Sequence, residues 1–371
     1  MKTVRRLFYV DIVTAVAFVA LAFLSLSFFI DFIDQLGDVG QNGYTMLQAS
    51  LYALLQLPGH FYEVAPIAVL IGTIYTLARM AQSSEYTILR TGGLGPWRAL
   101  SLLTTLGLVF GVLTFVVGDY LAPLSERQAT QVQAMYKGGL KLGRSGAWLK
   151  DHVTTPDGEL SYSINVGSAG PKSLLRDIRI FEFDGDGRLL RRIGAESAQV
   201  EPNQTWTLKD VTLTRWAADK DATDGVQVPE QKLAEMTWRS GLSAAVVAAA
   251  VSPVSSMSTI DLARYIVHLS DNEQAAQSHQ IQFWKRALYP FACLVMVGLA
   301  LPFAYMHARA GGVSLKVFGG IMLGISFVLL NNVAGHLGLL RNWTPWLVAA
   351  APSLLYLLLS FAAFSWLVRY R

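Results

Sequence analysis

The chain has 371 residues, of which 53% are hydrophobic and only 15% carry a charge. Soluble domains carry charge on about 25% of their residues, so this composition excludes an ordinary soluble globular protein. The net charge is +4, but no stretch combines clustered basic residues with interleaved aromatic ones, which argues against nucleic-acid binding. The single cysteine, Cys293, allows no intramolecular disulfide.

Six apolar segments are long enough to cross a membrane, because a helix needs about 20 residues to span the hydrocarbon layer. They form two groups of three around a polar region at 123–281. Their approximate ranges are 8–33, 51–78, 99–118, 287–306, 317–335 and 345–368. The first segment is too long for a signal peptide and no cleavage site follows it, so we expect it to be retained.

The polar region holds 17 of the 30 Lys and Arg residues and 19 of the 26 Asp and Glu residues. Basic residues favour the cytoplasmic ends of spans. With the N-terminus inside, the cytoplasmic segments carry ten: Lys2, Arg5, Arg6, Arg79, Arg90, Arg98, Arg309, Lys316, Arg369 and Arg371. The opposite short connections carry only Arg341. We therefore expect both termini in the cytoplasm and the polar region outside.

Short alternating segments predict that the polar region is rich in β-strands. Apolar and polar residues alternate over 160–166, the period of a half-buried strand. Further strands are expected at 176–183, 188–200, 206–214 and 233–239. A hairpin is expected at Asp184-Gly185-Asp186-Gly187, because Gly and Asp accept positive φ angles. The spacing favours a sandwich, a jelly roll or an open barrel.

The end of the polar region is expected to turn helical. The Ala- and Val-rich stretch 244–251 is too short to span a bilayer and is interpreted as a strand or a buried edge. Ser258 with Asp261 predicts a capping box that starts a helix. Ile260, Tyr265 and Ile266 form its expected apolar face. A second polar helix is expected from about residue 272 into the fourth span.

Motifs for catalysis and metal binding are weak. The phosphate-binding loop of nucleotide hydrolases is absent from the sequence. His60 and Glu63 have a spacing that can place two metal ligands on one helix face. They lie beside Pro58-Gly59 at an expected membrane boundary, so a hinge with polar groups is the alternative.

The connection at 81–96 predicts a short helix on the cytoplasmic face. Ser83 or Ser84 can cap its start, and Gly92-Gly93 can end it. It would offer Tyr86, Ile88 and Leu89 to a soluble partner. An ordinary interfacial helix without a partner fits the same residues, and both interpretations remain open.

Charged residues are also expected at the outer membrane boundary. Lys285 and Arg286 begin the fourth span on the outer side, against the usual tendency of basic residues. They can hold an anionic lipid head group or simply extend to the interface. Asp31, Asp34 and Asp38 stand at the outer end of the first span, where they can pair with cations or end the helix.

Four short stretches resemble one family of membrane proteins. They are FIDQL at 32–36, AQSSE at 81–85, GDYLAP at 118–123 and QAMY at 133–136. With the six spans and the inserted β-region, this order is similar to the LptF/LptG (YjgP/YjgQ) permeases of lipopolysaccharide export. The stretch at 32–36 and the pair Trp284-Lys285 resemble the LptG branch more than LptF.

The resemblance implies an inner-membrane α-helical permease subunit, with a periplasmic jellyroll-like domain at 123–281 between spans at 1–122 and 282–371. It implies pairing with LptF, two copies of the ATPase LptB, LptC, and delivery to the bridge protein LptA. The chain itself would hold no catalytic residue and no cofactor, since ATP and Mg²⁺ bind to LptB. Glu85, Tyr86, Ile88, Leu89 and Arg90 would belong to a coupling helix at about 82–93 that docks on the ATPase.

The resemblance also implies a lateral gate for lipopolysaccharide at the first span, near Phe32 and Asp34. Basic residues expected there are replaced by Asp31, Gly37 and Asp38. Lys285, Arg286 and Arg127 then become the expected head-group contacts. The alternatives are the sister subunit LptF, a membrane-anchored periplasmic sensor or scaffold, and a secondary transporter. Few ionisable residues lie at mid-membrane depth, which disfavours the last.

Overall fold

The structure is a computed structural model, and it describes residues 2–137, 140–141, 146–155, 158–169, 174–201, 204–216, 229–242, 244–251, 254–271, 276–305 and 313–370. Arg309 and Arg371, both used to predict the orientation, lie outside these ranges. The chain divides into two compact units. Unit 1 comprises residues 1–37, 53–126 and 277–371, and unit 2 comprises 38–52 and 127–276.

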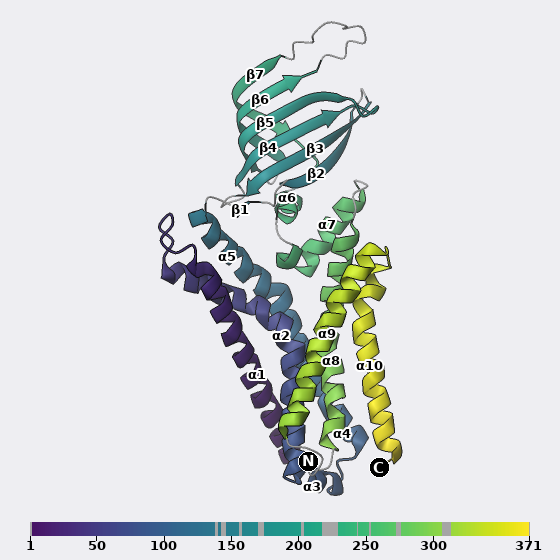
Figure 1. Cartoon of the computed structure of the whole chain (residues 1–371). Helices are drawn as coiled ribbons and strands as arrows, with labels where there is room; N and C mark the ends of the chain where they lie inside the picture. The colour runs from purple at the N-terminus through teal and green to yellow at the C-terminus, as the bar shows by residue number, and fades with distance from the viewer. Residues whose placement is uncertain are drawn as a thin grey trace. The chain divides into compact units, whose positions relative to one another are not determined.

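Unit 1 is a bundle of long apolar helices (Figure 1). Its helices are α1 (Lys2–Leu36), α2 (Met46–Gln82), α3 (Glu85–Thr91), α4 (Pro96–Val116), α8 (Gln277–Ala304), α9 (Val313–Leu340) and α10 (Pro345–Tyr370). A π-helical turn, η1 (Val117–Leu121), joins α4 to α5 (Ala122–Lys137). Among the described residues, six helices are long and apolar enough to cross a membrane. The prediction of six spans is confirmed.

The predicted hinge at Pro58-Gly59 lies inside helix α2 and stays a prediction. Helix α2 continues without a break through Pro58 and Pro66. Proline removes one backbone hydrogen bond from a helix, but membrane helices tolerate this loss because neighbouring groups satisfy the freed carbonyl. α2 is therefore one continuous helix of 37 residues, longer than the roughly 20 residues that a span needs.

Unit 2 is built on one antiparallel sheet, whose described strands from β2 to β7 follow each other in space as in sequence. The strands are β1 (Leu140–Lys141), β2 (Ala147–Thr155), β3 (Gly158–Ala169), β4 (Leu174–Phe183), β5 (Leu189–Val200), β6 (Thr205–Arg215) and β7 (Glu230–Arg239). β1 and β2 both pair with β3, and the order continues from β3 to β7. The prediction of a β-rich inserted domain is confirmed, including the hairpin at 184–187, where Gly187 has φ +78°.

The sheet is curled, so that strands distant in the hydrogen-bonding order meet. Tyr162 on β3 packs edge to face against Trp238 on β7, with ring centroids 5.5 Å apart. Asp151 on β2 accepts a hydrogen bond from Ser240, which follows β7. The enclosed face holds the core, formed by residues such as Leu149, Ile164, Ile180, Ile193 and Trp206.

Two helices of unit 2 correct or confirm the sequence-based expectations. Residues 244–250 form helix α6 (Ala244–Ala250), so the predicted strand is wrong. Alanine is the strongest helix former, and Val247 packs into the core of the sheet. The capping box of α7 (Thr259–Asp271) is confirmed by Asp261 N–H donating to Ser258 Oγ at 3.1 Å. Its buried face consists of Leu262, Tyr265 and Leu269, whereas Ile260 is exposed.

Candidate functional site: a surface helix and a polar cluster in the bundle

The short helix α3 lies between α2 and α4, at the same end of unit 1 as the start of α1 and the end of α10 (Figure 1). Gly92 ends it as predicted, with its N–H donating to the carbonyl of Ile88. The predicted serine cap is wrong. Ser84 has φ +63° and makes no side-chain cap, while Ser83 Oγ donates to the Arg79 carbonyl and so completes α2.

One tyrosine fixes α3 to the bundle. Tyr86 is 2% exposed and packs edge to face against Tyr305, with ring centroids 5.1 Å apart. Burial raises the pKa of the Tyr86 phenol, and the neighbouring Tyr305 phenol adds to the shift. Arg90 places its guanidinium over the Tyr305 ring at 5.8 Å. The phenol therefore stays neutral and acts as an apolar anchor with a polar tip.

The anchoring leaves a small, defined surface on α3. Leu89 is partly buried against the helix core, whereas Tyr86 is buried within it, so the expectation that Tyr86 faces a partner is wrong and that for Leu89 stays a prediction. Ile88 is 67% exposed, and Glu85 and Arg90 are exposed as well. A partner that docks on the outer side of α3 would contact these three residues.

Helices α1 and α2 run antiparallel and are held together at two levels, by an ion pair at one and by a hydrogen bond to a histidine at the other. Asp11 bonds Arg79 at 2.7 Å, and Asp31 bonds His60 at 2.7 Å. The two levels are separated by about 30 Å along each helix, at 1.5 Å per residue. That separation is close to the thickness of a hydrocarbon layer.

More polar groups surround the Asp31–His60 contact. Glu63 accepts a hydrogen bond on its carbonyl from the Tyr289 hydroxyl at 2.6 Å. Tyr62 packs on Tyr289, and Gly118 of the π-helical turn lies against the Tyr62 ring. A Cβ at Gly118 would approach the ring to 2.1 Å, so only glycine fits. The turn also buries Asp119, which is 7% exposed.

The three predicted head-group cations occupy different surroundings. Lys285 Nζ donates to the Asn331 carbonyl of α9 at 2.9 Å and lies against Gly335. Arg286 interacts electrostatically with Tyr62 and Glu126. Arg127 forms an ion pair with Asp261 in unit 2. Arg286 thus belongs to the polar cluster of unit 1 and Lys285 to a contact with α9, and their head-group role stays a prediction.

The end of α1 carries the other predicted gate residues. Phe32 is half-buried and stacks on Phe28 at 6.1 Å, and Asp34 is exposed. His60 does not pair with Glu63 in a metal site but with Asp31. Within the described ranges, no three His, Cys, Asp or Glu side chains are arranged to hold a metal ion.

Sequence reasoning missed the pairing of Asp31 with His60 and the close contact at Gly118. Both join helices that are far apart in sequence, and periodicity carries no signal for such pairs. The only hint was the presence of ionisable residues at the boundaries of apolar segments.

Six apolar helices long enough to cross a membrane, a short helix between two of them and a β-domain inserted after the third define a multi-span membrane protein, as far as the described residues go. Residues 6–367 match the family described as lipopolysaccharide export system permease LptF/LptG. The chain belongs to this family, and the resemblance seen in its short motifs is confirmed.

Relatives in two organisms carry the LptG name. The chain is 28% identical to lipopolysaccharide export system permease protein LptG of Escherichia coli (strain K12) over 353 residues, covering 94% of both chains. It is 25% identical to the LptG of Haemophilus influenzae (strain Rd) over 361 residues, covering 96% of this chain and 97% of that one. The match therefore includes both units.

Proposed function

We propose that the chain is a membrane permease subunit that is driven by a separate ATPase and moves lipopolysaccharide out of the inner membrane. Its partners would be LptF as the second permease, two copies of LptB as the ATPase, and LptC. The lipid would then pass to the periplasmic bridge protein LptA. The family membership supports lipopolysaccharide export, and the partners and the energy source are the proposed part.

The observation that supports coupling best is the geometry of α3. A coupling helix must be fixed to the membrane helices that move, and it must also contact the ATPase. Tyr86 fixes α3 to α8 through Tyr305, and Ile88 with Glu85 faces away from the bundle. A movement of a partner bound to this surface would be transmitted to α2, α4 and α8, because these helices share one packed core.

The proposed orientation places α3 and both termini in the cytoplasm and the hairpin of unit 2 in the periplasm. Arg79, Arg90 and Arg98 lie near α3, in agreement with the positive-inside tendency. The access route for lipid would border α1, whose residues Phe18, Leu21 and Ile33 are each more than 60% exposed. Such a surface is stable only against lipid or another apolar helix.

Replacing Ile88 by aspartate tests the docking surface. We expect copurification of LptB to fall at least about tenfold, because a charge replaces the exposed apolar contact at an interface. The Ile88→Met variant, which keeps an apolar side chain, should retain the ATPase. Both variants should keep the melting temperature of the isolated chain, since residue 88 does not contribute to the core. If the aspartate variant copurifies with LptB as well as the unmodified chain does, the proposed coupling role of α3 is wrong.

The orientation can be tested by cysteine labelling, because the single native cysteine, Cys293, is buried. A membrane-impermeant maleimide added to intact spheroplasts should label Asp186→Cys at the β4–β5 hairpin. It should label Ile88→Cys only after the membrane is permeabilised. The unmodified chain serves as the control and should stay unlabelled in both conditions. Labelling of residue 88 in intact spheroplasts would reverse the proposed orientation.

A further inference from the structure

The solvent face of the sheet in unit 2 carries an open groove of about 350 Å³. It runs across β4, β5 and β6 and is lined mainly by polar groups, among them Arg179, Arg192, Glu196 and Thr214. Gly194 lies on its floor, and a Cβ there would meet only the Thr212 carbonyl oxygen, at 3.9 Å. A side chain at position 194 would therefore occupy the groove without disturbing the protein.

A row of unpaired residues crosses the sheet at this groove. Asp177, Glu196 and Asp210 lie on neighbouring strands, and each is left out of the pairing between β4, β5 and β6, while the register is the same on both sides of them. Asp177 and Asp210 have φ angles of +53° and +52°. The regular pairing is thus interrupted along this row, and the three carboxylates line the groove.

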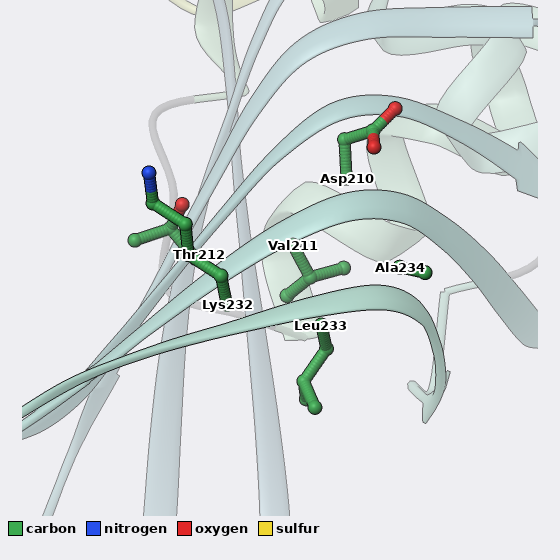
Figure 2. A pocket seen from close by; sticks show the side chains of 6 residues that line it. All are labelled: Asp210, Val211, Thr212, Lys232, Leu233 and Ala234. Carbon is green, nitrogen blue, oxygen red and sulfur yellow. The ribbon is translucent and has the colours of Figure 1, made fainter.

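A second hollow extends the groove towards the edge strand β7. It shares Asp210 and Thr212 with the first and adds Lys232. Thr212 and Lys232 pair in register, and their side chains lie together in Figure 2. The combined surface is elongated, which suits a chain-like ligand better than a compact one.

An aromatic pair, Trp148 and Phe181, flanks the groove at the end away from β7. Arg192, which lines the groove, lies over the Phe181 ring at 5.9 Å, and Phe181 stacks on Trp148 at 6.1 Å. Trp148 is 51% exposed although it stands on a sheet. The register links Trp148 through Asn165 and Arg179 to Gly194, which places Trp148 about 14 Å from the groove floor at about 4.8 Å per strand.

The combination of groups identifies the chemistry of the ligand. Carboxylates and guanidinium groups make paired hydrogen bonds with neighbouring hydroxyls, and Thr212 and Thr214 add neutral donors. An aromatic face is electron-rich and attracts the weakly positive C–H groups of a sugar ring. Acidic groups and the basic groups Arg179, Arg192 and Lys232 line the combined groove together, so it offers both acceptors and donors to a hydroxyl-rich ligand.

We propose that this groove binds an oligosaccharide, with sugar hydroxyls on the acid and arginine groups around Gly194 and a sugar ring stacked on Trp148. The inference rests on the proposed function, since the sugar chain would be that of the exported lipopolysaccharide. The groove would hold this chain outside the sheet and keep it away from the apolar core.

The test uses the full-length chain in detergent and the core oligosaccharide that mild acid releases from lipopolysaccharide, which lacks acyl chains. Isothermal titration calorimetry should detect binding to the unmodified chain. Gly194→Leu should weaken it at least tenfold by filling the groove, and Trp148→Ala should weaken it about three- to tenfold. Gln199→Leu, on the same strand but outside the groove, is the matched control and should bind normally.

The outcomes separate the alternatives. Equal binding by the unmodified chain and by Gly194→Leu would overturn the proposal, as would no binding at all. Binding of a decalysine peptide that Gly194→Leu abolishes, without sugar binding, would instead make the groove a protein-docking site. Should Gly194→Leu fail to fold, Trp148→Ala and Arg192→Ala decide the question. If the unmodified chain restores lipopolysaccharide export in cells but binds no sugar, only this inference fails and the proposed function stands.

Discussion

Replacing Gly72 by leucine is expected to separate α1 from α2 and to abolish export. A Cβ at Gly72 would lie 2.6 Å from the backbone nitrogen of Val16 and 2.7 Å from its Cα. Backbone atoms cannot move aside as a side chain can, so the two helices must shift apart. Membrane helices rely on such small residues for close packing because no hydrophobic driving force acts between them.

The side-chain bonds near the two ends of the α1–α2 contact increase the loss of stability that we expect from this substitution. Asp11 with Arg79 and Asp31 with His60 each require the present separation of the helices, and a shift at Gly72 lengthens both. Overpacking alone costs about 1–3 kcal/mol. We expect the melting temperature of the purified chain in detergent to fall by about 5 °C or more.

The same helix supplies the control for this experiment. Gly59 also lies in α2, and a Cβ there would meet nothing within 4 Å. Gly59→Leu adds the same side chain and should leave both the melting temperature and export close to those of the unmodified chain. Equal losses in the two variants would show that leucine harms α2 for a reason unrelated to its contact with α1.

Patterns local in sequence predicted most of the elements. The spans followed from uninterrupted apolar runs, and β3 to β6 followed from alternation and from the Asp-Gly hairpin, because these signals act within one element. The capping box at Ser258 was equally local. The helix at 244–250 was predicted as a strand because a short apolar run does not distinguish the two.

The features that the sequence did not predict depend on contacts between elements that are distant in sequence. The sequence identified the α3 surface helix but not which of its residues face inward, since Tyr86 is buried by Tyr305, more than 200 residues away. It singled out His60 and paired it with the wrong residue, Glu63, where Asp31 is the partner. Gly72, Gly118 and Gly194 looked alike in sequence, and only their neighbours show that the first two permit close packing and the third leaves a groove open.

The second large loss of stability is expected when Asp151 is replaced. Its carboxylate joins the two edges of the curled sheet. Asp151 is 5% exposed, and its Oδ2 accepts hydrogen bonds from Ser240 Oγ and from the Gly241 N–H, both at 2.7 Å. Ser240 Oγ in turn accepts from the Leu242 N–H. This chain of bonds fixes the segment after β7 to β2, although the two strands are not neighbours in the sheet.

Removing the carboxylate should release that segment. Asp151→Ala leaves the donors of Ser240 and Gly241 without their acceptor, which costs about 2–4 kcal/mol for charge-assisted bonds in a buried site. Trp206 and Trp238 pack on each other near this end of β7, with ring centroids 5.5 Å apart. The loss should therefore appear as earlier unfolding by tryptophan fluorescence and as faster proteolysis near residue 240.

Two variants separate the bonds of Asp151 from a general effect of removing an acid. Asp151→Asn keeps an acceptor oxygen in place and should lose less stability than Asp151→Ala, because the bonds persist without their charge. Asp186→Ala removes a carboxylate from the exposed hairpin and should change the free energy of unfolding by less than about 0.5 kcal/mol. Stability of Asp151→Ala equal to that of Asp186→Ala would mean that core packing, including Tyr162 against Trp238, holds the sheet closed without this bond.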